Sequence, residues 1–524
     1  MERSRAGIAA IIVVGSAVLI LTGLGRYAFW NDEAYTALLA KSVWRTGDTC
    51  AVFGHNLIAF QGGAALEGLR HRFDPPLAYY LAAPFLGLFG DHALAGRLPF
   101  ALCGLAAIAL IVRWAWRAGA DTRSWVLLAA AVLGNVSFVL YSRQCRYYAL
   151  AVLCSTALAY LYAHWDGRRR GLAAMAVVSL CLLATNYLNY AALYACGVVD
   201  YLAWGRQRRR FTRHELLLLL APQAIVGAVL VSVWNPLGKA VVPYASASWL
   251  ADRATLLWWN VRDLVRCEYG VGLFLLAAPL AAWARGSRWL LRGFVALLIY
   301  ILTVALLSPQ PVAATDVADV RYLVPLIPLG IALSVLVVAA VARRFPWAAA
   351  ALAIAGFGSN LLGGVPLAGD PVRATLYEYI GELTHPRQTP YGAAAAWINQ
   401  NLAEGCSAWV LPEYALSPLM FHAPRAVYAW QLSDPPHDQF RGLPDIHFKD
   451  RVPPDYIIAF GPVVMPLRRT LDAWRAKGLR YYSADTLPVY WRDGTRPELV
   501  WHAFRALEDY EASSEGVYIF VRRS

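Results

Sequence analysis

The stretch RYLVPLIPLGIALSVLVVAAVARR, residues 321–344, indicates the fold class of this protein. Between its terminal arginines it contains no charged residue, and about 20 apolar residues in a helix are enough to cross the hydrocarbon core of a bilayer. Arg321 at one end, and Arg343 with Arg344 at the other, mark where the chain meets water. We therefore expect a transmembrane helix over residues 321–342.

Comparable apolar runs recur along the first two thirds of the 524 residues. The chain is 59% hydrophobic and 15% charged, whereas a soluble domain is about 45–50% apolar and about 25% charged. This composition excludes an ordinary soluble enzyme, a disordered chain and a small disulfide scaffold. The expected fold class is a polytopic α-helical membrane protein. We expect eleven spans, over residues 6–25, 93–112, 124–141, 147–164, 171–186, 188–204, 215–234, 269–285, 289–307, 321–342 and 345–362.

The orientation follows from the distribution of arginine between alternate connections. Basic residues concentrate on the cytoplasmic side of a membrane protein. One set of connections, together with the N-terminus, holds 18 arginines, and the other set is longer and poorer in basic residues. We therefore expect a cytoplasmic N-terminus and an extracytoplasmic C-terminal region. Residues 77–90 are apolar but too short to span, and we interpret them as an interfacial or re-entrant helix. The 18 arginines are residues 3, 5, 113, 117, 123, 168–170, 206, 208–210, 213, 285, 288, 292, 343 and 344.

The net charge of +13 reflects this topology. Residues 1–363 hold 31 Lys and Arg against 16 Asp and Glu, and residues 364–524 hold 16 against 18. A nucleic-acid-binding protein concentrates basic residues on one soluble face, whereas here they form short clusters between apolar runs. We therefore expect the lipid bilayer, and no nucleic acid, as a partner. The eight cysteines show neither a CxxC pair nor metal-ligand spacing, so they define no cofactor.

The sequence predicts two domains. Residues 1–363 form a membrane domain with two long external loops, over residues 26–92 and 235–268. Residues 364–524 form an extracytoplasmic soluble domain with a small α/β fold. Its expected strands lie over residues 407–412, 455–460 and 516–521, and its expected helix over residues 392–402.

An adjacent acid pair, Asp32 and Glu33, follows the first expected span. An anionic membrane surface repels carboxylates, so such a pair is a poor anchor. One interpretation is a solvated helix start in which an acidic residue complements the helix dipole. The other is a carboxylate that faces a cavity and acts as a general base or a metal ligand. The residues alone leave both interpretations open.

Three arginines lie on the side that is otherwise poor in basic residues. Arg143 and Arg146 lie in the run YSRQCRYY over residues 141–148, and Arg321 lies at the mouth of a later span. The guanidinium group offers a planar fork of donors that suits phosphate. The alternative is that these side chains extend towards lipid headgroups. A fourth motif, residues 70–80, contains two prolines that introduce a helix, which is equally compatible with a plain turn.

These motifs occur in one order along the chain. The acid pair comes first, and the segment PPLAYY (residues 75–80), the run from Gly90 to Pro99, the run over 141–150 and RYLVPLIP (residues 321–328) follow. In this order they resemble the lipid-phosphosugar-dependent glycosyltransferases of the GT-C superfamily. The resemblance is nearer to the bacterial branch that includes protein mannosyltransferases and the aminoarabinose transferase of lipid A. It covers about residues 20–365.

The resemblance implies an integral membrane enzyme of the bacterial inner membrane that acts in glycosylation at the cell envelope. A hexosyl or pentosyl group would pass from a polyprenyl-phosphate donor to an acceptor hydroxyl on the extracytoplasmic side, with inversion. Asp32 matches the catalytic carboxylate, and Glu33 would orient Asp32 or the acceptor. The leaving phosphate would be bound by Arg146 and Arg321, then Arg143 and Arg72. The acceptor, which is a lipid, a glycan or a protein, and the identity of the sugar stay open.

The resemblance also places residues along the substrate channel, where the sequence departs from the family. Tyr79, Tyr80 and Tyr147 would line it. The family often has His or Lys before the two prolines, whereas this chain has Asp74. We expect either that His71 or Arg72 replaces the missing basic residue, or that Asp74 itself contacts the sugar. A divalent cation is a possible cofactor, with Asp32 and Glu268 as candidate ligands, although the chain has no DxD-like motif.

Two other classes of function compete with this interpretation. A transporter or lipid flippase places ionisable groups near the middle of the bilayer, and the expected spans are almost free of them there. A scaffold or polymer-export subunit would not need the external acidic and basic residues. The glycosyltransferase is therefore the main hypothesis, with the transporter or flippase as the alternative.

Overall fold

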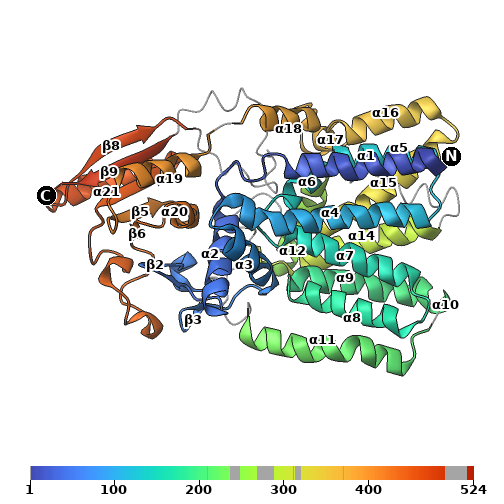
Figure 1. Cartoon of the computed structure of the whole chain (residues 1–524), viewed down its shortest axis with the longest axis horizontal. Coiled ribbons are helices and arrows are strands. Elements are labelled where there is room, and N and C mark those ends of the chain that lie inside the picture. The colour runs from blue at the N-terminus through green and yellow to red at the C-terminus, as the bar shows by residue number, and fades with distance from the viewer. Residues whose placement is uncertain are drawn as a thin grey trace.

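The computed structural model describes residues 2–208, 210–235, 248–267, 288–310, 312, 320–369, 371–386, 388–489 and 516–523. A bundle of roughly parallel helices forms one part of the molecule, and a mixed sheet flanked by helices forms the other (Figure 1). The N-terminus lies at the end of the bundle that is remote from the sheet. Two further helices, α2 and α3, lie between the bundle and the sheet.

The bundle confirms a polytopic helical membrane protein. Five described helices are long and apolar enough to cross a membrane, and α5 with α6, which meet at a bend of 58°, make a sixth candidate. The bend falls at Asn135, whose side chain accepts a hydrogen bond from the Phe138 N–H and so begins α6. The bundle helices are α1 (Glu2–Leu21), α4 (Ala93–Arg117), α5 (Thr122–Gly134), α6 (Val136–Ser142), α7 (Tyr148–His164), α8 (Arg169–Leu183), α9 (Tyr187–Asp200), α11 (Arg213–Val233), α14 (Arg288–Leu307), α15 (Ile327–Ala342) and α16 (Pro346–Phe357).

Each expected span except one overlaps a described helix, and the span expected over residues 124–141 corresponds to the bent pair α5 and α6. The exception, residues 269–285, lies outside the described residues. The count of eleven spans therefore stays a prediction. The short helix α10 (Arg206–Arg208) lies at the same end of the bundle as the N-terminus (Figure 1). This arrangement agrees with the alternation of arginine along the sequence, while the side that faces the cytoplasm stays a prediction.

The first expected external loop contains α2 (Asn31–Thr46) and α3 (Leu77–Phe89), which pack on each other at the end of the bundle (Figure 1). The 13 residues of α3 are too few to span a bilayer. Gly47 ends α2 at φ 75°, a conformation that favours glycine, and its N–H donates to the Val43 carbonyl. Two small hairpins connect α2 to α3: β1 (Val52–Phe53) with β2 (Asn56–Leu57), and β3 (Leu66–Glu67) with β4 (Arg70–His71).

The C-terminal region contains a five-stranded sheet in the order β6-β5-β7-β9-β8. Strand β5 is parallel to β6 and β7, and β9 is antiparallel to β7 and β8. The strands expected near residues 407, 455 and 516 coincide with β5, β7 and β9, whereas β6 and β8 were not predicted. The strands are β5 (Ser407–Leu411), β6 (Val427–Tyr428), β7 (Tyr456–Phe460), β8 (Tyr481–Leu487) and β9 (Val517–Arg522). The remaining helices are α12 (Trp249–Cys267), α17 (Gly364–Ala368), α18 (Thr375–Thr384), α19 (Pro390–Asn401), α20 (Leu416–His422) and α21 (Val464–Ala476).

The C-terminal region packs directly on the first loop. The side-chain amide of Asn56 donates to the Ala426 carbonyl at 2.9 Å and accepts from the Tyr428 N–H at 2.8 Å. This buried amide thus satisfies backbone groups at the edge strand β6. The Phe29 N–H donates to His422 Nε2 at 2.9 Å, so α20 also contacts the segment that introduces α2. The start of α2 is therefore held between the bundle and the C-terminal region.

Candidate active site

Asp32, Arg146 and Arg321 meet where α2 covers the end of the bundle. Asp32 Oδ2 lies 2.8 Å from Arg321 Nη1 and 3.7 Å from Arg146 Nη2. Asp32 belongs to the first turn of α2, Arg146 precedes α7, and Arg321 lies in the 3₁₀ turn η4 (Val320–Tyr322). Their side chains are 17%, 11% and 22% exposed. The two guanidinium groups thus share one carboxylate, so that the donors of the cluster outnumber its acceptors.

Arg146 retains hydrogen-bonding capacity after these contacts. Its Nη1 donates to Thr36 Oγ1 at 3.1 Å, and that hydroxyl donates to the Asp32 carbonyl at 2.9 Å. Its buried Nε has no hydrogen-bond partner among the described residues. A buried donor of this kind favours an additional acceptor atom, such as a phosphate oxygen.

Glu33 lies next to Asp32 but has a different environment. It is 1% exposed, and Arg97 contacts both of its oxygens, with Nε at 2.8 Å and Nη2 at 2.6 Å. The Cys145 N–H donates to the same carboxylate at 2.8 Å. Because Cys145 precedes Arg146, Glu33 connects the segment that carries Asp32 to the segment that carries Arg146. The role expected for Glu33, to orient Asp32 or the acceptor, stays a prediction.

Arg97 lies in the run from Gly90 to Pro99, and the sequence pattern assigned it no role. Besides Glu33, it donates to the carbonyls of Leu24 and Tyr27 at 3.0 and 2.9 Å and to that of Ala28 at 3.2 Å. It therefore fixes the segment between α1 and α2. The available signal was an ionisable residue inside an apolar helix, a feature that usually marks a partnered or functional group.

The structure does not place Arg143 or Arg72 at Asp32. Arg143 Nη1 donates to the carbonyls of Leu19, Ile20 and Thr22 at 2.7–3.0 Å, because the last carbonyls of α1 have no partner within the helix. Arg72 contacts both oxygens of Asp48, at 2.9 and 2.7 Å. Both side chains therefore have partners elsewhere, and neither belongs to the cluster of Asp32, Arg146 and Arg321.

Among the residues expected to line the substrate channel, His71, Tyr79 and Asp74 form a hydrogen-bonded network, and Tyr80 lies apart from it. His71 is 1% exposed and contacts Tyr35 through Nδ1 at 2.9 Å and Tyr79 through Nε2 at 3.2 Å. Tyr79 donates to Asp74 at 3.2 Å. Tyr80 instead donates to the Gly47 carbonyl at 2.9 Å and is 41% exposed.

Tyr147 adjoins the basic pair, since its ring centroid lies 5.5 Å from the Arg146 guanidinium. Asp74 belongs to the same electrostatic environment. Partial burial raises the pKa of the Asp74 carboxyl, but the hydrogen bond from His71 and the charge of Arg146 outweigh it and bring the pKa to about 2. Asp74 is therefore ionised near neutral pH, and the position before the two prolines carries a negative charge.

No group of three or more potential metal ligands occurs among the described residues. Glu268, the second expected ligand, lies outside them. A divalent cation at Asp32 and Glu268 therefore stays a prediction.

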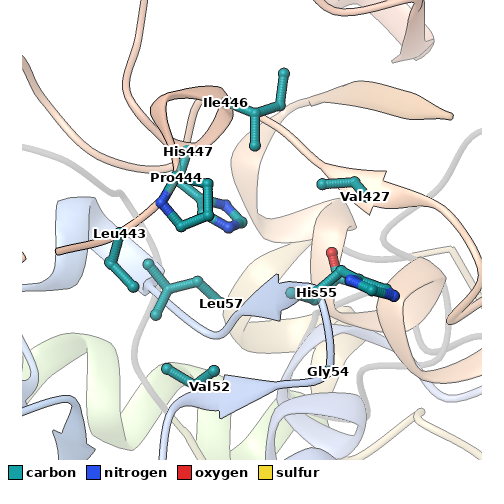
Figure 2. Close-up of a pocket in the computed structure, with 10 residues that line it drawn as sticks. Val52, Gly54, His55, Leu57, Val427, Leu443, Pro444, Ile446 and His447 are labelled. Atoms are coloured by element: carbon teal, nitrogen blue, oxygen red, sulfur yellow. The ribbon is translucent and has the colours of Figure 1, made fainter. Parts of the chain in front are cut away.

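A cavity of about 300 Å³ lies between the hairpin of β1 and β2 and the C-terminal region (Figure 2). Its walls are mainly apolar, and they include His447, which is 3% exposed and whose Nδ1 has no hydrogen-bond partner among the described residues. None of the residues predicted for the site lines this cavity. Its lining is Val52, Gly54, His55, Asn56, Leu57, Val427, Leu443, Pro444, Ile446 and His447.

Residues 74–234 match the family model described as dolichyl-phosphate-mannose-protein mannosyltransferase. This match covers α3 to α11 and includes Asp74 and Arg146. Over these residues it confirms the resemblance to the membrane glycosyltransferases of the GT-C superfamily.

The whole fold is similar to that of ArnT from Cupriavidus metallidurans. The crystal structures of ArnT bound to undecaprenyl phosphate and in the apo state each match with a TM-score of 0.56 and 14% identity, over 98% of both chains. An oligosaccharyltransferase from Archaeoglobus fulgidus, in complex with zinc and sulfate, matches with a TM-score of 0.48 and 12% identity, over 86% of this chain and 68% of its own. No curated protein matches the sequence.

Replacing Glu33 with Gln is expected to destabilise the protein by about 3–5 kcal/mol, because Arg97 then stays buried without a counter-charge. Thermal unfolding in detergent measures the effect. Asp166→Asn is the matched control, since Asp166 pairs with Arg168 at 3.0 Å on the surface and an exposed pair contributes about 0–1 kcal/mol. Equal melting temperatures for Glu33→Gln and the wild type would contradict this account of the pair.

The lowered pKa of Asp74 predicts a pH dependence. The Asp74 carboxyl has a pKa of about 4 in the unfolded chain and of about 2 in the folded protein. Its ionised form therefore stabilises the folded protein above pH ~4, and this stabilisation is lost as the pH falls towards ~2. Asp74→Asn should therefore melt below the wild type at pH 7, and the difference between the two melting temperatures should start to shrink near pH ~4 and disappear only as the pH falls through ~2. A difference that persists unchanged to pH ~3 would show that the ionised carboxylate is not the source.

Proposed function

We propose that this protein is a glycosyltransferase of the bacterial-type inner membrane that transfers a sugar from a polyprenyl-phosphate donor to an acceptor hydroxyl. The observation that carries the proposal is the cluster of Asp32 with Arg146 and Arg321, which gathers a carboxylate and two guanidinium groups from three distant segments. The family match and the ArnT-like fold support the same class of reaction. The donor type is supported by the solved ArnT structure, which is bound to undecaprenyl phosphate.

The two arginines bind the phosphate that leaves. As the bond between the anomeric carbon and the phosphate oxygen breaks, negative charge grows on the phosphate. Guanidinium groups fixed beside that oxygen stabilise the charge without reorganising. Arg146 is suited to this role because its Thr36 contact fixes the side chain while the buried Nε stays available for an oxygen.

Asp32 acts as the general base. The acceptor oxygen attacks the anomeric carbon from the face opposite to the phosphate, and Asp32 takes the acceptor proton, so that the configuration inverts. A positioned base accelerates such a step by about 10²–10⁴. Glu33 and Arg97 are positioning residues in this scheme, because their ion pair fixes the first turn of α2.

The membrane orientation completes the proposal. The N-terminus and the arginine-rich connections face the cytoplasm, and the cluster, α2, α3 and the C-terminal region face the opposite side. The donor enters from the outer leaflet, and the acceptor is a lipid, a glycan or a protein. Asp74 and Tyr147, which adjoin Arg146, contact the sugar or the isoprenoid, while the buried His71 and Tyr79 fix Asp74.

Replacement of Asp32 by Asn is expected to abolish sugar transfer by removing the proton acceptor, while the protein stays folded. Transfer is measured in proteoliposomes loaded with radiolabelled polyprenyl-phosphate sugars extracted from a strain that lacks this protein. Binding of undecaprenyl phosphate, followed by thermal shift, should persist and serves as the control for folding. Turnover of Asp32→Asn at the wild-type rate would remove Asp32 from the role of base.

Replacement of Arg146 or Arg321 by Ala is expected to weaken the affinity for undecaprenyl phosphate about 10- to 100-fold, since each loses a charge-assisted hydrogen bond of about 1.5–3 kcal/mol. Arg253→Ala is the matched control, because Arg253 donates to the Ala305 and Ser308 carbonyls at 3.2 and 2.7 Å. Affinity is measured by titration in nanodiscs. Unchanged affinity in both Arg146→Ala and Arg321→Ala would contradict the proposed phosphate site.

A further inference from the structure

The carbonyl of Tyr322, which follows Arg321, lies at a break in the backbone hydrogen bonding. Two 3₁₀ turns, η4 and η5 (Val324–Leu326), precede α15. The next 3₁₀ donor in line for this carbonyl would be residue 325, which is a proline and has no N–H. The N–H of Leu326 donates instead to the Leu323 carbonyl, at 2.9 Å. The local sequence thus leaves the Tyr322 carbonyl to a donor from elsewhere.

Two side chains from other helices supply that donor. Asn189 Nδ2, on α9, donates to the Tyr322 carbonyl at 2.8 Å and to the Tyr300 hydroxyl at 2.8 Å. The Tyr300 hydroxyl, on α14, donates to the same carbonyl at 3.3 Å. Asn189 and Tyr300 are 0% and 1% exposed. The three groups therefore form a closed triangle inside the bundle.

The position of Asn189 is itself fixed by the start of α9. The side chain of Asn186 caps this helix by accepting the Asn189 N–H at 2.9 Å. A buried amide is costly unless it is hydrogen-bonded, and leucine would pack between apolar helices without that cost. The amide at residue 189 therefore has a specific use, which is to hold the peptide group next to Arg321.

We propose that Asn189 and Tyr300 are positioning residues for Arg321. By binding the Tyr322 carbonyl they fix the turn η4, so that the Arg321 guanidinium reaches Asp32 at 2.8 Å. This inference rests on the proposed function, in which the same guanidinium binds the donor phosphate. It adds two buried residues of the bundle that touch no substrate and act through the backbone of the Arg321 turn.

The test is a double-mutant cycle between Asn189→Leu and Arg321→Ala, with undecaprenyl phosphate as the ligand. Asn189→Leu is expected to weaken binding about 3- to 10-fold, the range for one buried hydrogen bond. In the Arg321→Ala background it should cause no further loss, because the group it positions is absent. Tyr300→Phe removes the hydroxyl, and with it the bond to the Tyr322 carbonyl at 3.3 Å and the bond from Asn189 at 2.8 Å. Because the Asn189 bond to the carbonyl stays, Tyr300→Phe should weaken binding less.

Gln223→Leu on α11 is the matched control. Gln223 is another buried amide of the bundle, whose Nε2 donates to the Leu219 carbonyl at 2.6 Å and whose Oε1 accepts from Tyr190 at 2.6 Å. It has no hydrogen bond to the Arg321 turn among the described residues, so its loss should leave the affinity unchanged. If Asn189→Leu does not fold, Tyr300→Phe, which keeps the ring, takes its place in the cycle.

The outcomes separate this inference from the proposed function. Equal losses for Asn189→Leu with and without Arg321, or no loss in the wild-type background, would overturn the positioning role. If Arg321→Ala alone leaves the affinity unchanged, Arg321 is not a phosphate ligand and the positioning role falls with it, whereas the phosphate site itself fails only if Arg146→Ala is also without effect. A loss that requires Arg321, together with an unchanged Gln223→Leu, supports the inference.

Discussion

The ion pair between Glu33 and Arg97 determines the geometry of the candidate active site. A carboxylate buried at the end of a membrane bundle needs a counter-charge and hydrogen bonds to offset its desolvation, and Arg97 supplies a bidentate contact at 2.6 and 2.8 Å. The same carboxylate accepts the Cys145 N–H. Since Glu33 follows Asp32 and Cys145 precedes Arg146, one buried interaction sets the distance between the proposed base and a proposed phosphate ligand.

Two adjacent carboxylates thus acquire different roles from their environments. Glu33 is enclosed and its oxygens are fully used, so it holds structure, whereas Asp32 is partly exposed and makes ion pairs that a substrate is able to replace. The arginines divide in the same way. Arg143 and Arg72 are bound by helix-end carbonyls and by Asp48, while Arg146 keeps a buried donor. Residue type alone therefore does not assign function at this end of the bundle.

The sequence predicted what depends on local pattern. Apolar length located the helices, and the order of the motifs pointed to Asp32, Arg146 and Arg321, which the structure brings together. It ranked Arg143 after Arg146 but did not exclude it, because the carbonyls that bind Arg143 lie at the end of α1, more than 100 residues away. Arg97 was visible as a charge in an apolar run, but its partner was not. Likewise, Pro325 indicates that the Tyr322 carbonyl receives no 3₁₀ hydrogen bond from residue 325. The sequence does not indicate that Asn189 is the donor, because that contact depends on how the helices pack.

The contact between Asp32 and Arg321 also bears on the order of events under the proposed function. The carboxylate and the guanidinium form an ion pair at 2.8 Å. The donor phosphate, a phosphodiester with one negative charge, competes with Asp32 for Arg321, and by taking that hydrogen bond it leaves Asp32 Oδ2 available for a proton. Donor binding would then activate the base, so that an acceptor, or water, meets a competent carboxylate only when a sugar is present. This exchange requires the ion pair of Asp32 and Arg321 to break, and that pair is partly exposed. The pair of Glu33 and Arg97, which holds the first turn of α2, is buried and stays intact in the same scheme.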